Sequence, residues 1–294
     1  MKPAPFDYVR PTTRAGVLAA LAEAGEDGKV LAGGQSLIPL LSMRLASPKV
    51  LVDINLVPDF SALDVSPTHV EIGPTVRHQE LLTSESVRKA VPLLAQALSY
   101  VAHPVIRNRG TSVGSIAHAD PSGELTAVLS LLDGVVTIEG HDGTREVTGS
   151  DFFLGPLESA INAGEMATRV TFGRLPVSMG TACVEVSRRH GDYALVGVCA
   201  AVVLGEENEI DRARISLFSV GPTPMVIDVS EVLNGARVDG PHWREAARFI
   251  ASCVDPEGDI HATAAYRKNL VEVLSKRGLQ SAYKNALDRV AVKQ

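Results

Sequence analysis

The sequence has little of what marks several large classes of protein. Aromatic residues make up only 4% of the 294 residues, so the core must be built mostly from aliphatic side chains. Lys and Arg total 28 against 34 Asp and Glu, which gives a formal net charge of -6. A nucleic-acid-binding protein is expected to carry a basic face, so this balance argues against that class.

Cysteine is scarce and scattered, at Cys183, Cys199 and Cys253. An iron–sulfur cluster usually takes four closely spaced thiolates, and a structural zinc site pairs Cys or His at short spacing. Because neither pattern occurs, we expect no metal site, and any redox chemistry must come from an organic cofactor or from another chain. An odd, scattered set of cysteines implies no disulfide framework and fits a reducing cytoplasm.

Long apolar segments are also lacking. No run approaches the roughly 18 apolar residues of a membrane span. The longest candidate, Ala194 to Leu204, better suits a buried strand. The N-terminal residues, MKPAPFDYVRPTTRAG, lack the apolar run of a signal peptide. We therefore expect a cytoplasmic protein without a membrane span.

Helical and strand patterns alternate in the first part of the chain. Thr12 or Thr13 is expected to cap a first helix that ends at Gly25. Apolar spacing then predicts the following strands, helices and one long polar loop: strand 29–32, helix 37–45, strand 50–54, paired strands 63–65 and 70–72, helix 86–100, loop 103–121, helix 124–132, strand 135–139 with a turn at 142–143, and strand 170–172.

The pattern changes near residues 174–177. Beyond them, strands come first (184–186, 195–204 and 215–220) and helices follow (229–233, 243–253 and 262–289). Strands followed by helices are typical of an α+β unit. We predict a first domain over residues 1–175, with lobes of about 1–57 and 58–175, and a second domain over 176–294.

A double-glycine loop is the strongest local feature. It joins a predicted strand to a predicted helix and consists of Ala32, Gly33, Gly34, Gln35, Ser36 and Leu37. Glycines let backbone N–H groups approach a phosphate, and a helix N-terminus adds unpaired donors. The spacing matches neither Gly-x-Gly-x-x-Gly nor a P-loop. A plain turn with a serine cap is the alternative interpretation.

A second cluster of small and hydroxyl residues lies in the polar loop and suits a further anion contact: Thr111, Ser112, Val113, Gly114 and Ser115. Glu124 opens the next helix, where the dipole stabilises a carboxylate that could also accept hydrogen bonds from a ribose. The alternative is a surface loop with Glu124 as an ordinary helix-start residue. For His118 and Asp120, a structural hydrogen bond is favoured over a catalytic pair.

The third feature is the segment from Ser187 to Ala194, between two predicted strands. From local sequence alone, Gly191 and Asp192 predict a hairpin turn with solvated arginines. The functional alternative is that Tyr193 covers a flat ring face.

Together the motifs resemble one family. Ala-Gly-Gly-Gln-Ser, then Arg-Asn-Arg-Gly-Thr with Ala-His-Ala-Asp-Pro, then Arg-Arg-His-Gly-Asp-Tyr-Ala occur in this order, and Asp259-Ile260-His261-Ala262 precedes the last helices. The chain is thus similar to the medium, FAD-binding subunit of molybdenum hydroxylases, the group of aerobic carbon monoxide dehydrogenase, quinoline oxidoreductase and xanthine dehydrogenases.

The resemblance implies an α+β fold: a two-lobed FAD-binding domain of the vanillyl-alcohol-oxidase/PCMH-like type and a C-terminal α+β domain. It implies that residues Ala32–Ser36 and Thr111–Ser115 wrap the FAD pyrophosphate, with Leu37 lining the first loop. Glu124 would meet the ribose, and Asp192 and Tyr193 would lie near the flavin ring. No residue is assigned as a catalytic acid, base or nucleophile, because the chemistry belongs to the cofactor.

The resemblance also implies partners. A large subunit would carry the molybdenum cofactor and a small subunit the iron–sulfur clusters, in a dimer of heterotrimers. Electrons would pass from those clusters to FAD and then to an external acceptor. Such a subunit is expected to expose apolar or aromatic patches for docking. The alternatives are a self-standing flavin reductase of related fold and an interaction protein without flavin.

Val113 departs from the family pattern, which usually has two glycines at Val113 and Gly114. Valine is β-branched and disfavours a positive φ. Ser112 is also polar where an aliphatic residue is common. We therefore expect either a backbone at Val113 that tolerates valine, or an FAD that binds differently or more weakly.

Overall fold

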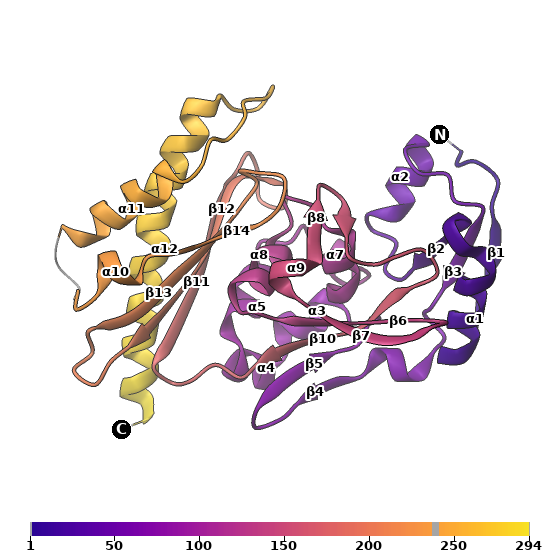
Figure 1. The fold of residues 1–294 in the computed structure, drawn as a ribbon, viewed down its shortest axis with the longest axis horizontal. Helices are drawn as coiled ribbons and strands as arrows, with labels where there is room; N and C mark the ends of the chain where they lie inside the picture. The colour runs from indigo at the N-terminus through magenta and orange to yellow at the C-terminus, as the bar shows by residue number, and fades with distance from the viewer. Residues whose placement is uncertain (1, 237–240, 294) are drawn as a thin grey trace.

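The computed structural model describes residues 2–236 and 241–293 (Figure 1). Three larger sheets follow one another along the molecule, and a fourth sheet has only two strands. A small parallel sheet lies at one end, a five-stranded sheet occupies the middle, and a four-stranded sheet covered by helices forms the other end. This order matches the α+β fold expected from the sequence.

The first sheet is parallel and has the strand order β1-β3-β2. Its strands and helices are β1 (Asp7–Val9), α1 (Arg14–Ala24), η1 (Gly25–Asp27), β2 (Gly28–Leu31), α2 (Leu37–Met43) and β3 (Val50–Asp53). The Thr13 side chain accepts a hydrogen bond from the Gly16 N–H, which confirms the expected cap. Val17, Leu21 and Val52 form its small core.

The second sheet is antiparallel, with the order β4-β5-β10-β6-β7. Its elements are η2 (Pro58–Ser61), β4 (Leu63–Val65), β5 (His69–Ile72), α3 (His78–Thr83), α4 (Glu85–Ala90), α5 (Pro92–Leu98), α6 (Pro104–Arg107), α7 (Ser112–His118), α8 (Glu124–Leu131), β6 (Val135–Gly140), β7 (Gly143–Thr148), α9 (Gly149–Phe152), β8 (Phe153–Gly155), β9 (Glu158–Ser159) and β10 (Met166–Gly173).

Two sequence predictions in this region were wrong. The single helix expected over 86–100 is interrupted at Val91, which has φ -137° and ψ 76° because Pro92 disfavours a helical residue before it. The loop expected over 103–121 contains the short helices α6 and α7. Helical periodicity is hard to see in segments this short, and their Gly and Ser content resembles that of a loop.

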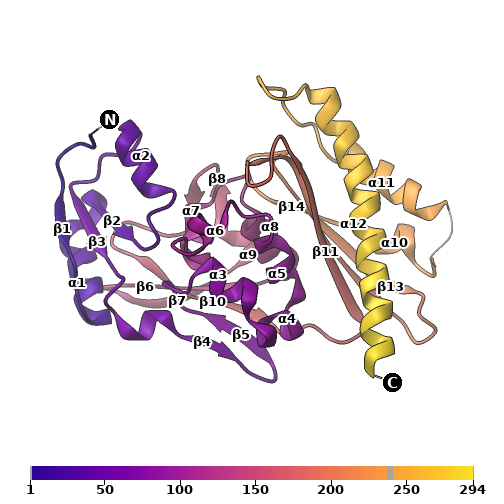
Figure 2. The ribbon, with the colours of Figure 1, turned by 180° about the vertical axis from the view of Figure 1, so that it is seen from behind.

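The third sheet is antiparallel, with the order β11-β12-β13-β14. Its elements are β11 (Met179–Ser187), β12 (Ala194–Leu204), β13 (Ile210–Phe218), β14 (Met225–Asp228), α10 (Ser230–Leu233), α11 (His242–Ser252) and α12 (Ala264–Lys293). Helix α12 crosses one face of this sheet, as Figure 2 shows from behind. Within the described ranges, no helix has the length and apolar character needed to cross a membrane.

One hydrophobic core joins the second and third sheets. Helices α5 and α8 pack against strands β11, β12 and β13. Leu94 and Val128 from these helices share a buried cluster with Cys199 and Phe218 of the sheet. Because α12 covers the opposite face, all positions of β12 are buried, which explains the unbroken apolar run seen in the sequence.

Candidate cofactor-binding site

The double-glycine loop after β2 lies directly against the segment before α7. A Cβ placed on Gly33 would lie 2.5 Å from the Arg109 carbonyl oxygen and 3.0 Å from the Thr111 nitrogen. Both neighbours are backbone atoms, so only glycine fits at this position. The structure thus brings together two motifs that are about 80 positions apart in the sequence.

A polar network holds these two loops in register. The Asn55 side-chain amide donates to the Ala32 carbonyl oxygen over 2.8 Å. Arg77 donates to the Asn55 side-chain oxygen over 2.7 Å and also to the Arg109 carbonyl oxygen. Asn55 and Arg77 therefore connect the first loop to the second, and the sequence motifs did not identify either residue.

The first loop leaves polar groups free to meet a ligand. Gly34 has φ +72°, and the Gln35 side chain donates to the Gly33 carbonyl oxygen over 3.1 Å. Ser36 takes the N-cap position of α2, but its side chain caps no N–H among the described residues. The serine cap expected in the alternative interpretation of this loop is therefore absent.

The second motif forms the first turn of α7. The Thr111 side chain caps the helix by accepting from the Gly114 N–H over 3.3 Å. Ser115 N–H donates to the Thr111 carbonyl oxygen over 2.9 Å. Val113 is 1% exposed, and its φ is not positive because it lies within the helix. The valine is thus accommodated by an ordinary helical backbone, which is the first of the two alternatives expected for this position.

His78 supports this turn from below. Its Nδ1 lies 3.0 Å from the Ser112 hydroxyl, and its backbone N–H donates to the Gly110 carbonyl oxygen. Burial, with further contributions from Arg107 and Arg77, lowers the pKa of His78 to about 4. The neutral imidazole therefore fixes the orientation of the Ser112 side chain at physiological pH.

Glu124 begins α8, as the sequence predicted. Burial, with smaller contributions from the nearby carboxylates of Glu185 and Asp120, raises the pKa of its carboxyl to about 8. A carboxyl that stays protonated near neutral pH can donate as well as accept a hydrogen bond. This group can therefore meet a hydroxyl-bearing ligand in either role.

Asp192 and Tyr193 lie in the hairpin between β11 and β12. The Asp192 N–H donates to the Arg189 carbonyl oxygen over 3.1 Å, and Gly191 has φ +86°, which confirms the predicted turn. Tyr193 is 68% exposed, and its hydroxyl donates to Asp120. The Tyr193 ring is thus held near the start of α8 with much of its surface open.

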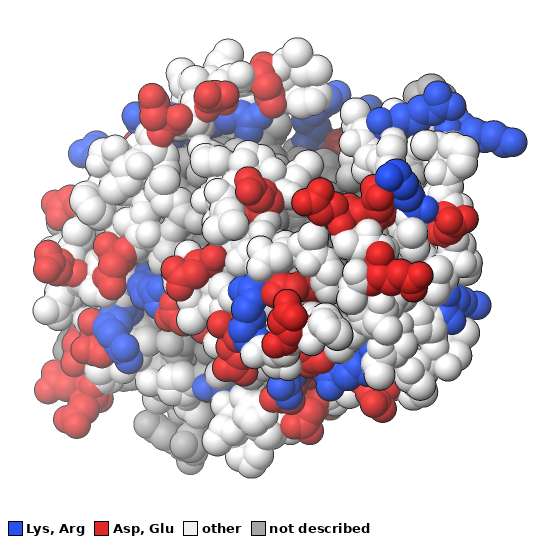
Figure 3. Space-filling view, turned by 45° about the vertical axis from the view of Figure 1, so that its right-hand side comes forward, with Lys and Arg blue, Asp and Glu red and all other residues white. Residues whose placement is uncertain are grey.

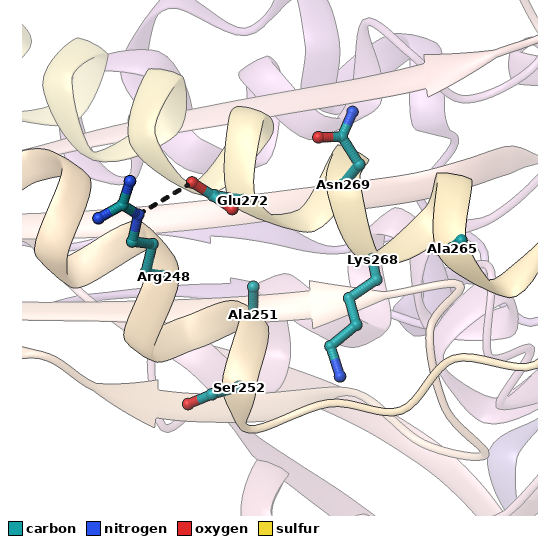
Figure 4. A pocket seen from close by; sticks show the side chains of 7 residues that line it. All are labelled: Arg248, Ala251, Ser252, Ala265, Lys268, Asn269 and Glu272. Atoms are coloured by element: carbon teal, nitrogen blue, oxygen red, sulfur yellow. Dashed lines mark ion pairs between the residues drawn. The ribbon is translucent and has the colours of Figure 1, made fainter.

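The predicted cofactor-binding residues lie on or next to four elements, α2, α7, α8 and the β11–β12 hairpin. Figure 1 shows these elements in succession across the upper half of the molecule. A hollow of about 530 Å³ lies elsewhere, between α11 and α12, where Arg248 and Glu272 form an ion pair (Figure 4). Figure 3 shows acidic and basic side chains interspersed over one face, without a continuous basic patch there.

These features fit an elongated dinucleotide cofactor. The glycine contacts bring two loops with backbone donors together, and the Ser36 hydroxyl forms no helix cap. Further along, a buried carboxyl and an exposed aromatic ring follow, at Glu124 and Tyr193. The sequence missed Asn55, Arg77 and His78; the only signal was that Asn55 follows directly after the predicted strand 50–54.

Comparison with known proteins gives matches over nearly the whole chain. The model described as the FAD binding domain in molybdopterin dehydrogenase matches residues 4–175, and the CO dehydrogenase flavoprotein C-terminal domain matches residues 182–282. The chain is 38% identical to the 6-hydroxypseudooxynicotine dehydrogenase complex subunit alpha of Paenarthrobacter nicotinovorans, over 97% of each chain.

Two further relatives agree with these matches. The carbon monoxide dehydrogenase medium chain of Hydrogenophaga pseudoflava is 32% identical, over 96% of this chain and 99% of its own. The crystal structure of quinoline 2-oxidoreductase from Pseudomonas putida 86 superposes with a TM-score of 0.93 at 33% identity, over 98% of this chain and 100% of that chain. The chain therefore belongs to the family of medium, FAD-binding subunits of molybdenum hydroxylases.

Proposed function

We propose that this chain holds one FAD along the edge formed by α2, α7, α8 and the β11–β12 hairpin. The loop residues Ala32–Leu37 and Thr111–Ser115 would hold the pyrophosphate, Glu124 the ribose, and Asp192 and Tyr193 the flavin ring. The observation that carries this proposal is the backbone contact between Gly33 and residues 109–111, because it joins the two phosphate-binding motifs.

The residues of this chain bind and orient the cofactor. Backbone N–H groups in the Gly33–Gly34 loop can neutralise phosphate charge. The Asn55–Arg77 network and His78 hold these donors in place. Bound FAD supplies the redox chemistry by accepting and releasing two electrons.

The partners and the electron route are also part of the proposal. Electrons would come from iron–sulfur clusters on a small subunit, after hydroxylation at a molybdenum centre on a large subunit, and would leave to an external acceptor. Relatives named as a complex subunit and as a medium subunit support a multi-subunit assembly. Exposed apolar side chains on α2 and beyond it, Ile38, Met43 and Leu45, suit a docking surface.

Three further features complete the proposal: a dimer of heterotrimers, a cytoplasmic location, and domain limits at 1–175 and 176–294 with lobes of about 1–57 and 58–175. The gap between β10, which ends at Gly173, and β11, which begins at Met179, supports the domain limit. Co-expression with the neighbouring subunits followed by mass measurement of the intact complex tests the stoichiometry.

The FAD-binding role is tested by a visible absorption spectrum of the purified chain, before and after excess FAD and desalting. We expect flavin bands that survive desalting at about one FAD per chain. The same measurement on the complex with its co-expressed partners is the second arm. A colourless protein in both arms would overturn the proposal.

A further inference from the structure

A buried arginine on α12 lies at the base of the β11–β12 hairpin. Arg267 is 7% exposed, although arginine is rarely buried without partners. Its Nη1 donates to the Leu195 carbonyl oxygen and, over 3.3 Å, to the Ser219 carbonyl oxygen. Its Nη2 donates to the Asp259 carboxylate over 2.7 Å. One guanidinium therefore joins β12, the residue after β13 and the segment before α12.

Leu195 is the extra residue of a β-bulge. The register of β11 and β12 shifts between Val186 and Ser187, which leaves Leu195 without an opposite residue on β11. The register of β12 with β13 begins only at Gly197. A bulge redirects its strand and leaves the extra residue outside the regular ladder. Arg267 thus gives the Leu195 carbonyl a charged donor where the ladder is irregular.

The bulge lies two residues after Tyr193, whose side chain is also connected to the arginine. The Tyr193 hydroxyl donates to Asp120. The Ser219 N–H donates to the Pro121 carbonyl oxygen over 2.9 Å, so the residue that accepts from Arg267 also holds the turn before α8. Short paths therefore lead from both the backbone and the hydroxyl of Tyr193 to Arg267.

A further contact reaches the hairpin from the segment that Asp259 organises. Asp259 accepts hydrogen bonds from the His261 and Ala262 N–H groups over 2.8 Å and 2.9 Å. The Nδ1 of His261 accepts from Arg188 over 3.0 Å, and Arg188 belongs to the hairpin. The motif at residues 259–262, to which the sequence assigned no role, thus supports the hairpin.

We propose that Arg267 is a positioning residue for the flavin site. With Asp259, it fixes the direction of the β11–β12 hairpin and so the placement of Asp192 and Tyr193 against the flavin ring. The flavin part of this inference rests on the proposed function, whereas the hold on the hairpin rests on the contacts alone. The guanidinium suits this role because it presents five N–H donors in a fixed fork. Lysine keeps the charge but loses the fork, so it should not hold all three acceptors.

The hold on the hairpin is tested without FAD, by hydrogen exchange of the full-length chain followed by mass spectrometry. In Arg267→Lys, the amides of residues 188–195 and 259–262 should exchange about tenfold faster than in the wild type, because hydrogen bonds to a charged group are lost. The β6–β7 hairpin should exchange as before, because it belongs to another sheet.

Arg289→Lys is the matched control. Arg289 lies on the same helix and donates to the Leu175 and Pro176 carbonyl oxygens over 3.3 Å and 3.2 Å, beyond the end of β11 that lies opposite the hairpin. This variant should leave the exchange of residues 188–195 unchanged. Wild-type exchange in Arg267→Lys would overturn the hold on the hairpin. Equal acceleration by both variants would also overturn it, because the effect would then be a general loss of stability.

Asp259→Asn is a milder second variant. Its side-chain oxygen can still accept from the His261 and Ala262 N–H groups, but the carboxylate that pairs with Arg267 is gone. The same two segments should exchange faster than in the wild type, by a smaller factor than in Arg267→Lys. If Arg267→Lys does not fold, wild-type exchange in Asp259→Asn would overturn the hold on the hairpin.

The effect on the cofactor is tested by visible circular dichroism and FAD titration of the chain or the complex. Arg267→Lys should change the circular dichroism of bound FAD, because the side chains beside the ring move. The FAD affinity should stay within about threefold, because the loops proposed for the pyrophosphate belong to other elements. An unchanged spectrum would overturn the role at the flavin.

Failure of the proposed function is distinguishable from failure of this inference. A chain and complex that bind no FAD would overturn that function together with the role at the flavin. The hydrogen exchange of the FAD-free chain then still decides whether Arg267 holds the hairpin.

Discussion

At Gly33, the space available for a side chain is set by a neighbouring loop. Gly33→Ala should push residues 109–111 away, because the added Cβ would lie 2.5 Å from a backbone oxygen and 2.8 Å from the Gly110 Cα. Overpacking of this kind costs about 1–3 kcal/mol. We expect FAD affinity to fall about tenfold or more, measured by flavin fluorescence titration.

The matched control is Gly173→Ala at the end of β10, where an added Cβ meets nothing within 4 Å and φ is not positive. This variant should bind FAD as the wild type does. Equal affinities for Gly33→Ala and the wild type would show that the loop contact does not shape the cofactor site.

At His78, burial links stability to pH. The unfolded imidazole has a pKa near 6.5 and the folded one about 4, so the unfolded chain binds more protons between these values. Stability is therefore lost as the pH falls through this window, by about 3 kcal/mol for a shift of this size. His78→Asn, which can keep the hydrogen bond to Ser112, should lose less stability over the same range.

The measurement is the free energy of unfolding in urea at about pH 7 and about pH 4 for both proteins. Because acidic groups titrate in both, the difference between the two proteins isolates His78. If the wild type and His78→Asn lost the same free energy of unfolding between these pH values, the His78 imidazole would have to be charged in the folded protein at the lower pH.

At the scale of elements, the β11–β12 hairpin is positioned by contact with a distant segment. Gly191 has φ +86°, and a Cβ there would lie 2.7 Å from the His103 ring. Gly191→Ala should cost about 1–3 kcal/mol in backbone strain and should move the loop that carries Asp192 and Tyr193. We expect altered visible circular dichroism of bound FAD together with the loss of stability.

Gly143→Ala in the β6–β7 hairpin separates these two effects. Gly143 has φ +131° but meets nothing within 4 Å, so the variant should lose stability without changing the flavin spectrum. A flavin spectrum unchanged in Gly191→Ala as well would place the hairpin away from the cofactor.

At the scale of the whole molecule, the second and third sheets share one core, so we expect them to unfold together. Trp243, the only tryptophan, is buried among the C-terminal helices and reports on that part of the chain. The release of FAD reports on the unfolding of the FAD-binding region. In urea the two signals should give a single coincident transition.

The Asp133–Arg214 ion pair, which joins the turn after α8 to β13 over 2.6 Å, is too exposed to explain such coupling alone. Arg214→Ala should therefore leave the two transitions coincident, whereas Phe218→Ala should destabilise both by about 3–5 kcal/mol. Separate midpoints in the wild type would contradict a shared core.

The sequence by itself determined the α+β pattern, most strands, the family and the FAD cofactor. Strands such as β12 were predictable because burial on both faces leaves a continuous apolar run. The cap at Thr13 and the turn at Gly191 were predictable because each depends on a local backbone requirement. Features that depend only on residues close in the sequence can be predicted from the sequence.

Only the tertiary structure decided how the site is assembled. The sequence left open whether the backbone at Val113 tolerates valine, and the helix that forms there removes the need for a positive φ. Asn55 and Arg77 act through loops that lie far from them in the sequence. Burial and charge proximity are properties of the folded molecule, so no local pattern could reveal them.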